Sequence, residues 1–387
     1  MQDTWCVSEK PFQYARRRGV EAIYTLGNGY LGCRGFLEEE RAGVEALGGI
    51  YMAGVFGQGA LKAWNGMHRE LVNTPNFLYA MICVDGEPVM TRPGRIFRFE
   101  RSLNMREGIL ERSFIWESRA GRRVQFRFER FMDVADLHLA GQRIEITPLE
   151  GKPRIELKVG IDARVVNLNM VTTIPLPIQP GRRHLKTLRM ESGIIETQVA
   201  TLPGGVRIAE GQQVVVEGTR GRPGGRAANA ADLLQNVYAW RGEAGKTARM
   251  TKLIHYFTSR DGSRPPREMV RKSMARRLDY DMLLVAHKKE WARKWHMADI
   301  GIEGAADDQA AVRYNLFQLI QACPGHDSRV SLGARGLSGE MHEGSVFWDN
   351  EIFKLPFFTF TDPLATRSML RFRHRTLPAA RRHAADL

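Results

Sequence analysis

Apolar and polar residues alternate along much of the first 260 or so positions of the chain. The clearest run is residues 124–131 (Val-Gln-Phe-Arg-Phe-Glu-Arg-Phe), which has the period of two expected for a half-buried β-strand. Shorter runs of the same kind occur at 144–146, 155–159, 206–208 and 214–216, and turn-forming residues separate them at 119–121, 150–153 and 202–205. Many short strands without intervening helices favour a large antiparallel β-sandwich.

The pattern then becomes helical. Residues 262–266 (Gly-Ser-Arg-Pro-Pro) form a linker, and from 267 to about 297 the apolar residues Leu284, Trp291 and Trp295 fall on one helical face. A second helix is predicted over 307–323. Two further capping predictions follow: Asp307 or Asp308 caps the second helix, and Asp362, followed by Pro363, caps a third.

These patterns predict three parts: a β-sandwich domain over 1–262, a helical linker over 263–300, and the beginning of an all-helical domain over 301–387. The length of 387 residues suits more than one domain, and the 43% hydrophobic fraction is that of a globular protein. Neither a signal peptide nor an apolar run long enough to span a membrane is visible, and the four cysteines show no metal or disulfide spacing. We therefore expect a cytoplasmic protein without membrane partners.

The net charge of +14 raises the question of nucleic acid. The arginine clusters are short, scattered and interleaved with acids, and the arginine–glycine stretch at 220–226 is not repeated, so we interpret it as a loop. We expect a basic, solvated surface and no nucleic-acid partner. The histidines are also scattered, so no metal site is expected.

Residues 27–32 (Gly-Asn-Gly-Tyr-Leu-Gly) match the spacing of a dinucleotide-binding loop. Such a loop needs a following helix and then a strand that ends in an acid, within repeated βαβ units. The next strand-like run, at 49–56, ends in Gly57 and Gln58 instead, and no βαβ pattern surrounds it. We therefore predict a tight glycine turn within the sandwich.

Residues 333–353 contain many of the side chains suited to binding or catalysis. Phe347, Trp348 and Asp349 follow a glycine-rich stretch that contains Arg335. Aromatic faces and carboxylates are what a sugar site requires. One alternative is purely structural: a long loop capped by Asp349, with Phe347 and Trp348 in the core. Glycosidic chemistry also needs a carboxylic acid as proton donor, and the residues alone do not separate the four candidates, Glu340, Glu343, Asp349 and Glu351.

Several ordered motifs resemble those of glycoside hydrolase family 65, which contains the kojibiose, maltose, nigerose and trehalose phosphorylases and some related hydrolases. Near the C-terminus they are Gly-Leu-Ser-Gly-Glu at 336–340, Phe-Trp-Asp at 347–349, Glu-Ile-Phe at 351–353 and Leu-Pro-Phe-Phe at 355–358. The resemblance extends over most of the chain. Its other motifs lie at 21–35, 71–76, 103–108, 291–295 and 299–303.

The resemblance implies a β-sandwich followed by an (α/α) toroid of six helical hairpins, usually in a homodimer. It implies an inverting reaction in which inorganic phosphate, the co-substrate, attacks an α-linked glucose disaccharide, with no cofactor or metal. A single glutamic acid protonates the leaving sugar. Trp348 and Asp349 match the family's glucose subsite, with Phe347 beside them, and Arg335 is expected to shape the adjacent loop.

The chain departs from the family pattern in two places. Gly344-Ser345 replaces a frequent Gly-His, which weakens assignment to the kojibiose or trehalose branch. The family's catalytic glutamate and phosphate-binding residues lie further downstream, so we expect the general acid beyond Leu387 and assign no catalytic residue within the chain. The chain is thus expected to be the N-terminal part of such a phosphorylase, inactive alone and with exposed apolar helix faces. The alternatives are part of a hydrolase of the same family or a non-catalytic carbohydrate-binding module.

Overall fold

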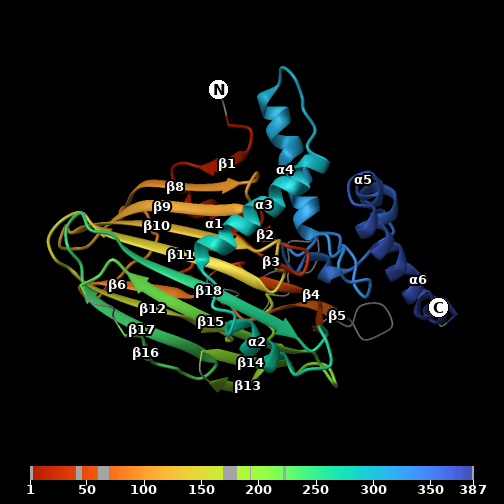
Figure 1. Cartoon of the computed structure of the whole chain (residues 1–387), viewed down its shortest axis with the longest axis horizontal. Helices are drawn as coiled ribbons and strands as arrows, with labels where there is room; N and C mark the ends of the chain where they lie inside the picture. The colour runs from red at the N-terminus through yellow and green to blue at the C-terminus, as the bar shows by residue number, and fades with distance from the viewer. Residues whose placement is uncertain are drawn as a thin grey trace.

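The computed structural model describes residues 3–40, 46–59, 69–168, 181–191, 193–220 and 224–385. Strands dominate this structure as far as Thr258, and longer helices follow from Pro266. In Figure 1 the sheets form one body, with α5 (Leu355–Thr361) and α6 (Pro363–Ala385) to one side of it. Within these ranges, no helix combines the length and the apolar character needed to cross a membrane.

The largest sheet of the described residues has nine antiparallel strands. Neighbours in it are mostly hairpin partners, except where β1 pairs with β8, β11 with β18 and β18 with β15. In spatial order the strands are β1 (Cys6–Glu9), β8 (Ile96–Asn104), β9 (Ile109–Glu117), β10 (Arg123–Met132), β11 (Leu139–Pro148), β18 (Ala248–Thr258), β15 (Arg207–Glu217), β14 (Ile194–Val199) and β13 (Leu185–Glu191).

Two smaller antiparallel sheets pack against this nine-stranded sheet. The five-stranded sheet consists of β16 (Arg226–Ala227), β17 (Leu233–Arg241), β12 (Arg154–Asp162), β6 (Ala80–Val84) and β7 (Glu87–Pro88). The four-stranded sheet consists of β2 (Leu26–Gly27), β3 (Leu31–Cys33), β4 (Ile50–Gln58) and β5 (Arg69–Asn73). A β-rich fold of layered antiparallel sheets therefore precedes a helical C-terminal part, as the sequence predicts.

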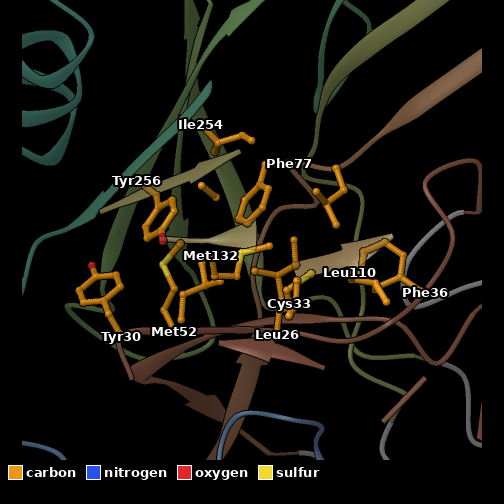
Figure 2. Close-up of a cluster of buried hydrophobic side chains, with 14 of the residues drawn as sticks. Leu26, Tyr30, Cys33, Phe36, Met52, Phe77, Leu110, Met132, Ile254 and Tyr256 are labelled. Atoms are coloured by element: carbon orange, nitrogen blue, oxygen red, sulfur yellow. The ribbon is translucent and has the colours of Figure 1, made fainter. Parts of the chain in front are cut away.

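The buried side chains come from both layers. Figure 2 shows Leu26 and Met52 of the four-stranded sheet beside Ile254 and Tyr256 of β18, with Phe77 among them. Phe77 and Tyr256 stack with ring centroids 5.8 Å apart. Each such buried side chain contributes about 1.5–3 kcal/mol to folding, so this shared core fixes the two layers to each other.

The alternation in the sequence places side chains correctly in β10, where Val124, Phe126 and Phe128 are buried and the residues between them are exposed. One detail differs. The run at 214–216 and all but the first residue of the run at 206–208 belong to a single strand, β15, because the polar Glu210 and Gln212 between them are buried inside the sandwich and do not form a turn. The predicted loop at 220–226 includes residues 221–223, which lie outside the described residues.

The helical stretch predicted over 267–297 is two helices, α2 (Pro266–Met274) and α3 (Tyr280–Ala298). They separate because Arg277 has a φ of 38° and Asp279 caps α3 by accepting hydrogen bonds from Asp281 N at 2.9 Å and Met282 N at 3.1 Å. Trp291 and Trp295 are buried as predicted, and Trp295 Nε1 donates to Met105 O at 2.9 Å. They attach α3 to the sandwich.

The helix predicted over 307–323 is α4 (Ala306–Ala322). The prediction that Asp307 or Asp308 caps it is wrong, because Ala305 occupies the cap position and both acids lie in the first turn, where they complement the helix dipole. Asp362 does cap α6, since its Oδ1 accepts a hydrogen bond from Ala365 N at 3.1 Å. Between α4 and α5 lie the short helices η2 (Met341–Gly344) and η3 (Asn350–Lys354), the latter a π-helix. Two short helices near the N-terminus, η1 (Tyr14–Arg16) and α1 (Arg17–Val20), complete the set among the described residues.

Candidate functional site

The glycine-rich segment 333–346 is bound to the sandwich. Gly344 lies against β4 and β5, so closely that an added Cβ would be 3.0 Å from Phe56 Cε1 and 3.2 Å from Leu71 Cβ. Arg34 Nη1 donates a hydrogen bond to Ser338 O, and the segment closes on itself through Ala334 N and Ser345 O at 3.0 Å. The segment that precedes the aromatic–acid residues is therefore fixed against the sandwich.

Glu340 is a partly buried acid within this segment. Its Oε1 accepts from the Tyr51 hydroxyl at 3.2 Å and its Oε2 accepts from Leu168 N at 2.8 Å. Burial raises the pKa of Glu340 to about 7, and these two hydrogen bonds offset the effect only in part. Because both oxygens are engaged, Glu340 links the segment to the sandwich.

Glu351 is also engaged. Its two oxygens each accept a hydrogen bond from Arg373 of α6 at 2.9 Å, and the same guanidinium donates to the carbonyls of Val346 and Phe347. Asn350, which is buried, donates to Leu332 O. These contacts fix the start of η3 from two sides. They also distinguish the two nearby acids, because Glu351 is engaged whereas Asp349 is exposed.

Phe347, Trp348 and Asp349 follow one another at the start of η3, and all three are exposed. Phe347 is 44% and Trp348 is 68% exposed, so the interpretation that places them in the core is wrong. Asp349 occupies the cap position of η3 but makes no capping hydrogen bond, so the structural role considered for it is wrong as well. The indole ring of Trp348 and the carboxylate of Asp349 are therefore both exposed on a turn that is fixed in place.

Lys354 is a residue of this region that the sequence reasoning missed. Its Nζ donates to Gly333 O at 2.9 Å, and burial lowers the pKa of Lys354 while the charge of Asp349 opposes that shift. Lys354 lies five positions after Asp349, at the end of η3, and the sequence carries no signal for this pairing, because the π-helical conformation is rare and not announced by residue spacing.

Arg335 and Lys354 both line a cavity of about 500 Å³ between the β2–β3 hairpin, α4 and the start of the glycine-rich segment. The structure therefore brings Arg335, Lys354 and Asp349 into one region. Trp348 and Phe347 do not line this cavity. The rest of its wall is mostly apolar, with some amide and hydroxyl side chains, among them Gln318 and Ser338. Amides, hydroxyls and flanking charges are the groups that recognise sugar hydroxyls.

The hairpin at this cavity contains the motif at 27–32. Gly29 has a φ of 82°, and its N–H donates to Gln321 O at 2.7 Å. A Cβ at Gly29 would lie 2.1 Å from Cys323 O. The predicted tight glycine turn is confirmed, and its glycine allows the hairpin to pack against the end of α4.

Comparison with known proteins identifies the family. Residues 7–294 match the model of the glycosyl hydrolase family 65 N-terminal domain, and residues 313–387 match that of the family's central catalytic domain. The kojibiose phosphorylase of Halothermothrix orenii is 33% identical, over 99% of this chain and 48% of its own length. The maltose phosphorylase of Bacillus subtilis is 29% identical, over 100% of this chain and 51% of its own length.

A solved structure described as a putative kojibiose phosphorylase from the human microbiome shares the fold, with a TM-score of 0.83 at 23% identity over 97% of this chain and 49% of that one. The chain spans about half the length of these relatives. The N-terminal model alone matches well over half of the chain. The chain belongs to glycosyl hydrolase family 65.

Proposed function

We propose that this chain is part of an inverting disaccharide phosphorylase that cleaves α-linked glucose disaccharides with inorganic phosphate. The supporting relatives are phosphorylases of kojibiose, maltose, nigerose and trehalose. The observation that carries the proposal is the exposed Trp348–Asp349 pair, held at the start of η3 by the bonds from Arg373. This pair provides a flat apolar face and a carboxylate side by side.

In this proposal Trp348 stacks on the apolar face of the reacting glucose and Asp349 accepts hydrogen bonds from its hydroxyls. Phe347 borders the pair, and Arg335 shapes the loop beside it. Phosphate then attacks the anomeric carbon from the face opposite the leaving sugar, which a glutamic acid protonates. We assign that proton transfer to neither Glu340 nor Glu351, because both are engaged in bonds within the protein.

We further propose that residues 1–262 form the sandwich domain, residues 263–300 form the linker, and the helices from α4 onward begin an (α/α) toroid. The complete enzyme is proposed to be a cytoplasmic homodimer without a cofactor. These proposals rest on the family membership and on the change from strands to helices near residue 262.

The glucose subsite is tested by titrating the purified chain with glucose, kojibiose, maltose, nigerose and trehalose and following tryptophan fluorescence and heat. We expect saturable binding that weakens about tenfold or more in Trp348→Ala and Asp349→Asn, since stacking and one charge-assisted hydrogen bond each contribute on the order of 1–2 kcal/mol. Phe360→Ala is the matched control, because Phe360 is 84% exposed on α5, outside the pair. Unchanged affinity in both site variants contradicts the subsite.

The reaction is tested by incubating the same disaccharides with and without phosphate. Phosphate-dependent release of glucose 1-phosphate by the chain, or by a longer protein that contains it, supports the phosphorylase. Release of glucose without phosphate identifies a hydrolase, and binding without any turnover in the longer protein identifies a sugar-binding module.

A further inference from the structure

A second cavity of about 500 Å³ lies on the other side of the glycine-rich segment, between that segment and the sandwich. Its wall comprises parts of β4 and β5, the turn at 202–206, the loop at 329–333 and Phe372 of α6. This volume is within the usual range for small-molecule sites. Trp348, Asp349 and Arg335 do not line it.

Three arginines from separate segments line this cavity, Arg69, Arg260 and Arg329, whereas none of the described acidic residues does. One carboxylate beside it, Asp327, pairs with Arg329 at 2.8 Å and with Arg260 at 3.4 Å. Arg69 has no ion pair or hydrogen bond from its side chain among the residues that the structure describes. The cavity therefore carries a surplus of positive charge, which attracts anions.

The three arginines differ in whether contacts within the protein account for their positions. Arg260 and Arg329 share the carboxylate of Asp327 as an ion-pair partner. Arg329 Nη1 also donates a hydrogen bond to Arg260 O at 2.7 Å. Arg260 packs closely against the backbone of Gly54, because a Cβ added to that glycine would lie 2.6 Å from Arg260 Cζ. A structural network thus accounts for two of the three guanidiniums, while Arg69 extends the basic wall beyond what that network requires.

Apolar groups make up much of the rest of the lining. Phe56 of β4 and Phe372 of α6 line the cavity together with Leu71, Leu337 and Val346. Phe56 packs against the backbone of Gly344, because a Cβ added to that glycine would lie 3.0 Å from Phe56 Cε1. A site that contains both guanidiniums and aromatic rings suits a ligand that combines an anionic group with a ring.

We propose that this cavity binds a sugar monophosphate, with its phosphate on Arg69 and Arg329 and its ring against Phe56 and Phe372. Guanidinium groups bind phosphate oxygens in pairs, which gives both affinity and orientation. The choice of a sugar as the ring rests on the proposed function, whereas anion binding rests on the cavity alone. This site is separate from the Trp348–Asp349 pair and from the phosphate that takes part in the reaction.

The test is calorimetric titration of the purified chain with glucose 1-phosphate, glucose 6-phosphate, inorganic phosphate and glucose at low and moderate salt. We expect one of the sugar phosphates to bind at least about tenfold more tightly than phosphate, and its affinity to fall with salt because the cavity is open to solvent. Arg69→Gln should weaken this binding about tenfold, and Arg69→Lys should weaken it less, because charge is kept and paired bonding is lost.

Arg92→Gln is the matched control, since Arg92 is exposed outside the cavity and its loss changes the net charge equally. Circular dichroism and thermal unfolding establish that each variant folds. Equal affinity for phosphate and for both sugar phosphates overturns the sugar assignment, and wild-type affinity in Arg69→Gln overturns the site. Loss of binding in Trp348→Ala but not in Arg69→Gln would instead assign the ligand to the glucose subsite and refute this inference without affecting the proposed function.

Discussion

The side chain of Glu340 joins segments that are far apart in the sequence. It accepts hydrogen bonds from Tyr51 on β4 and from Leu168, which follows β12. The sequence alone left Glu340, Glu343, Asp349 and Glu351 equivalent as candidate acids. The structure distinguishes them by their partners, because Glu340 and Glu351 hold the segment in place while Asp349 remains exposed.

The raised pKa of Glu340 predicts a pH-dependent stability. A carboxyl whose pKa rises on folding, here to about 7, stabilises the protein fully below its unfolded value near 4.5, and that contribution is lost as the pH rises through 7. Glu340→Gln lacks this titration. The free energy of unfolding of the variant should therefore increase relative to that of the wild type by about 2 kcal/mol between pH 5 and pH 8. Urea unfolding at both pH values measures it.

Glu303→Gln serves as the control for this prediction, because Glu303 is exposed and its side chain makes no ion pair or hydrogen bond with the other described residues. Its unfolding free energy should follow that of the wild type at both pH values. A constant difference between Glu340→Gln and the wild type across this range would contradict the assigned burial effect.

At the scale of elements, the β2–β3 hairpin and the end of α4 fit together through glycine. Local reasoning predicted the turn correctly from the spacing of its glycines. It did not predict that Gly29 donates to Gln321 O or that Cys323 O leaves no space for a side chain, because that contact joins residues nearly 300 positions apart. The π-helical turn of η3, which brings Lys354 toward Asp349, is likewise a product of packing on both sides.

Gly29→Ala should be strongly destabilising, by roughly 3 kcal/mol or more, because it combines a positive φ with a clash against backbone. Gly86→Ala is the matched control: Gly86 has a similar φ of 85° in another hairpin but nothing within 4 Å of an added Cβ. That variant should lose only about 1–2 kcal/mol. Thermal unfolding of the two proteins compares the costs, and equal losses would show that the contact with α4 is unimportant.

At the scale of the whole molecule, the sandwich is well covered and the C-terminal helices are not. Ile352, Phe353, Phe360 and Leu364 are between 55% and 84% exposed along η3, α5 and α6. Figure 1 shows these helices at one side of the sheets. Large apolar side chains exposed in this way favour association in water.

The chain should therefore self-associate as its concentration rises, and Phe360→Glu combined with Leu364→Lys should reduce this association at least severalfold. Light scattering over a concentration series measures the effect. Met282→Lys is a useful control, because Met282 is 74% exposed on α3, away from these helices. If the double variant associates as strongly as the wild type, another surface is responsible.

The sequence by itself determined the β-rich part, the later helices, the glycine turn and the aromatic–acid motif, because each depends on residues close together in the chain. The period of two in β10 and the caps near residue 362 are local signals of this kind. It could not show that Arg207–Glu217 is one strand, since Glu210 and Gln212 are buried by distant neighbours. Only the tertiary structure decided which acids are engaged, where Lys354 lies and that three arginines meet at one cavity. Those arrangements depend on contacts between segments that the chain order does not encode locally.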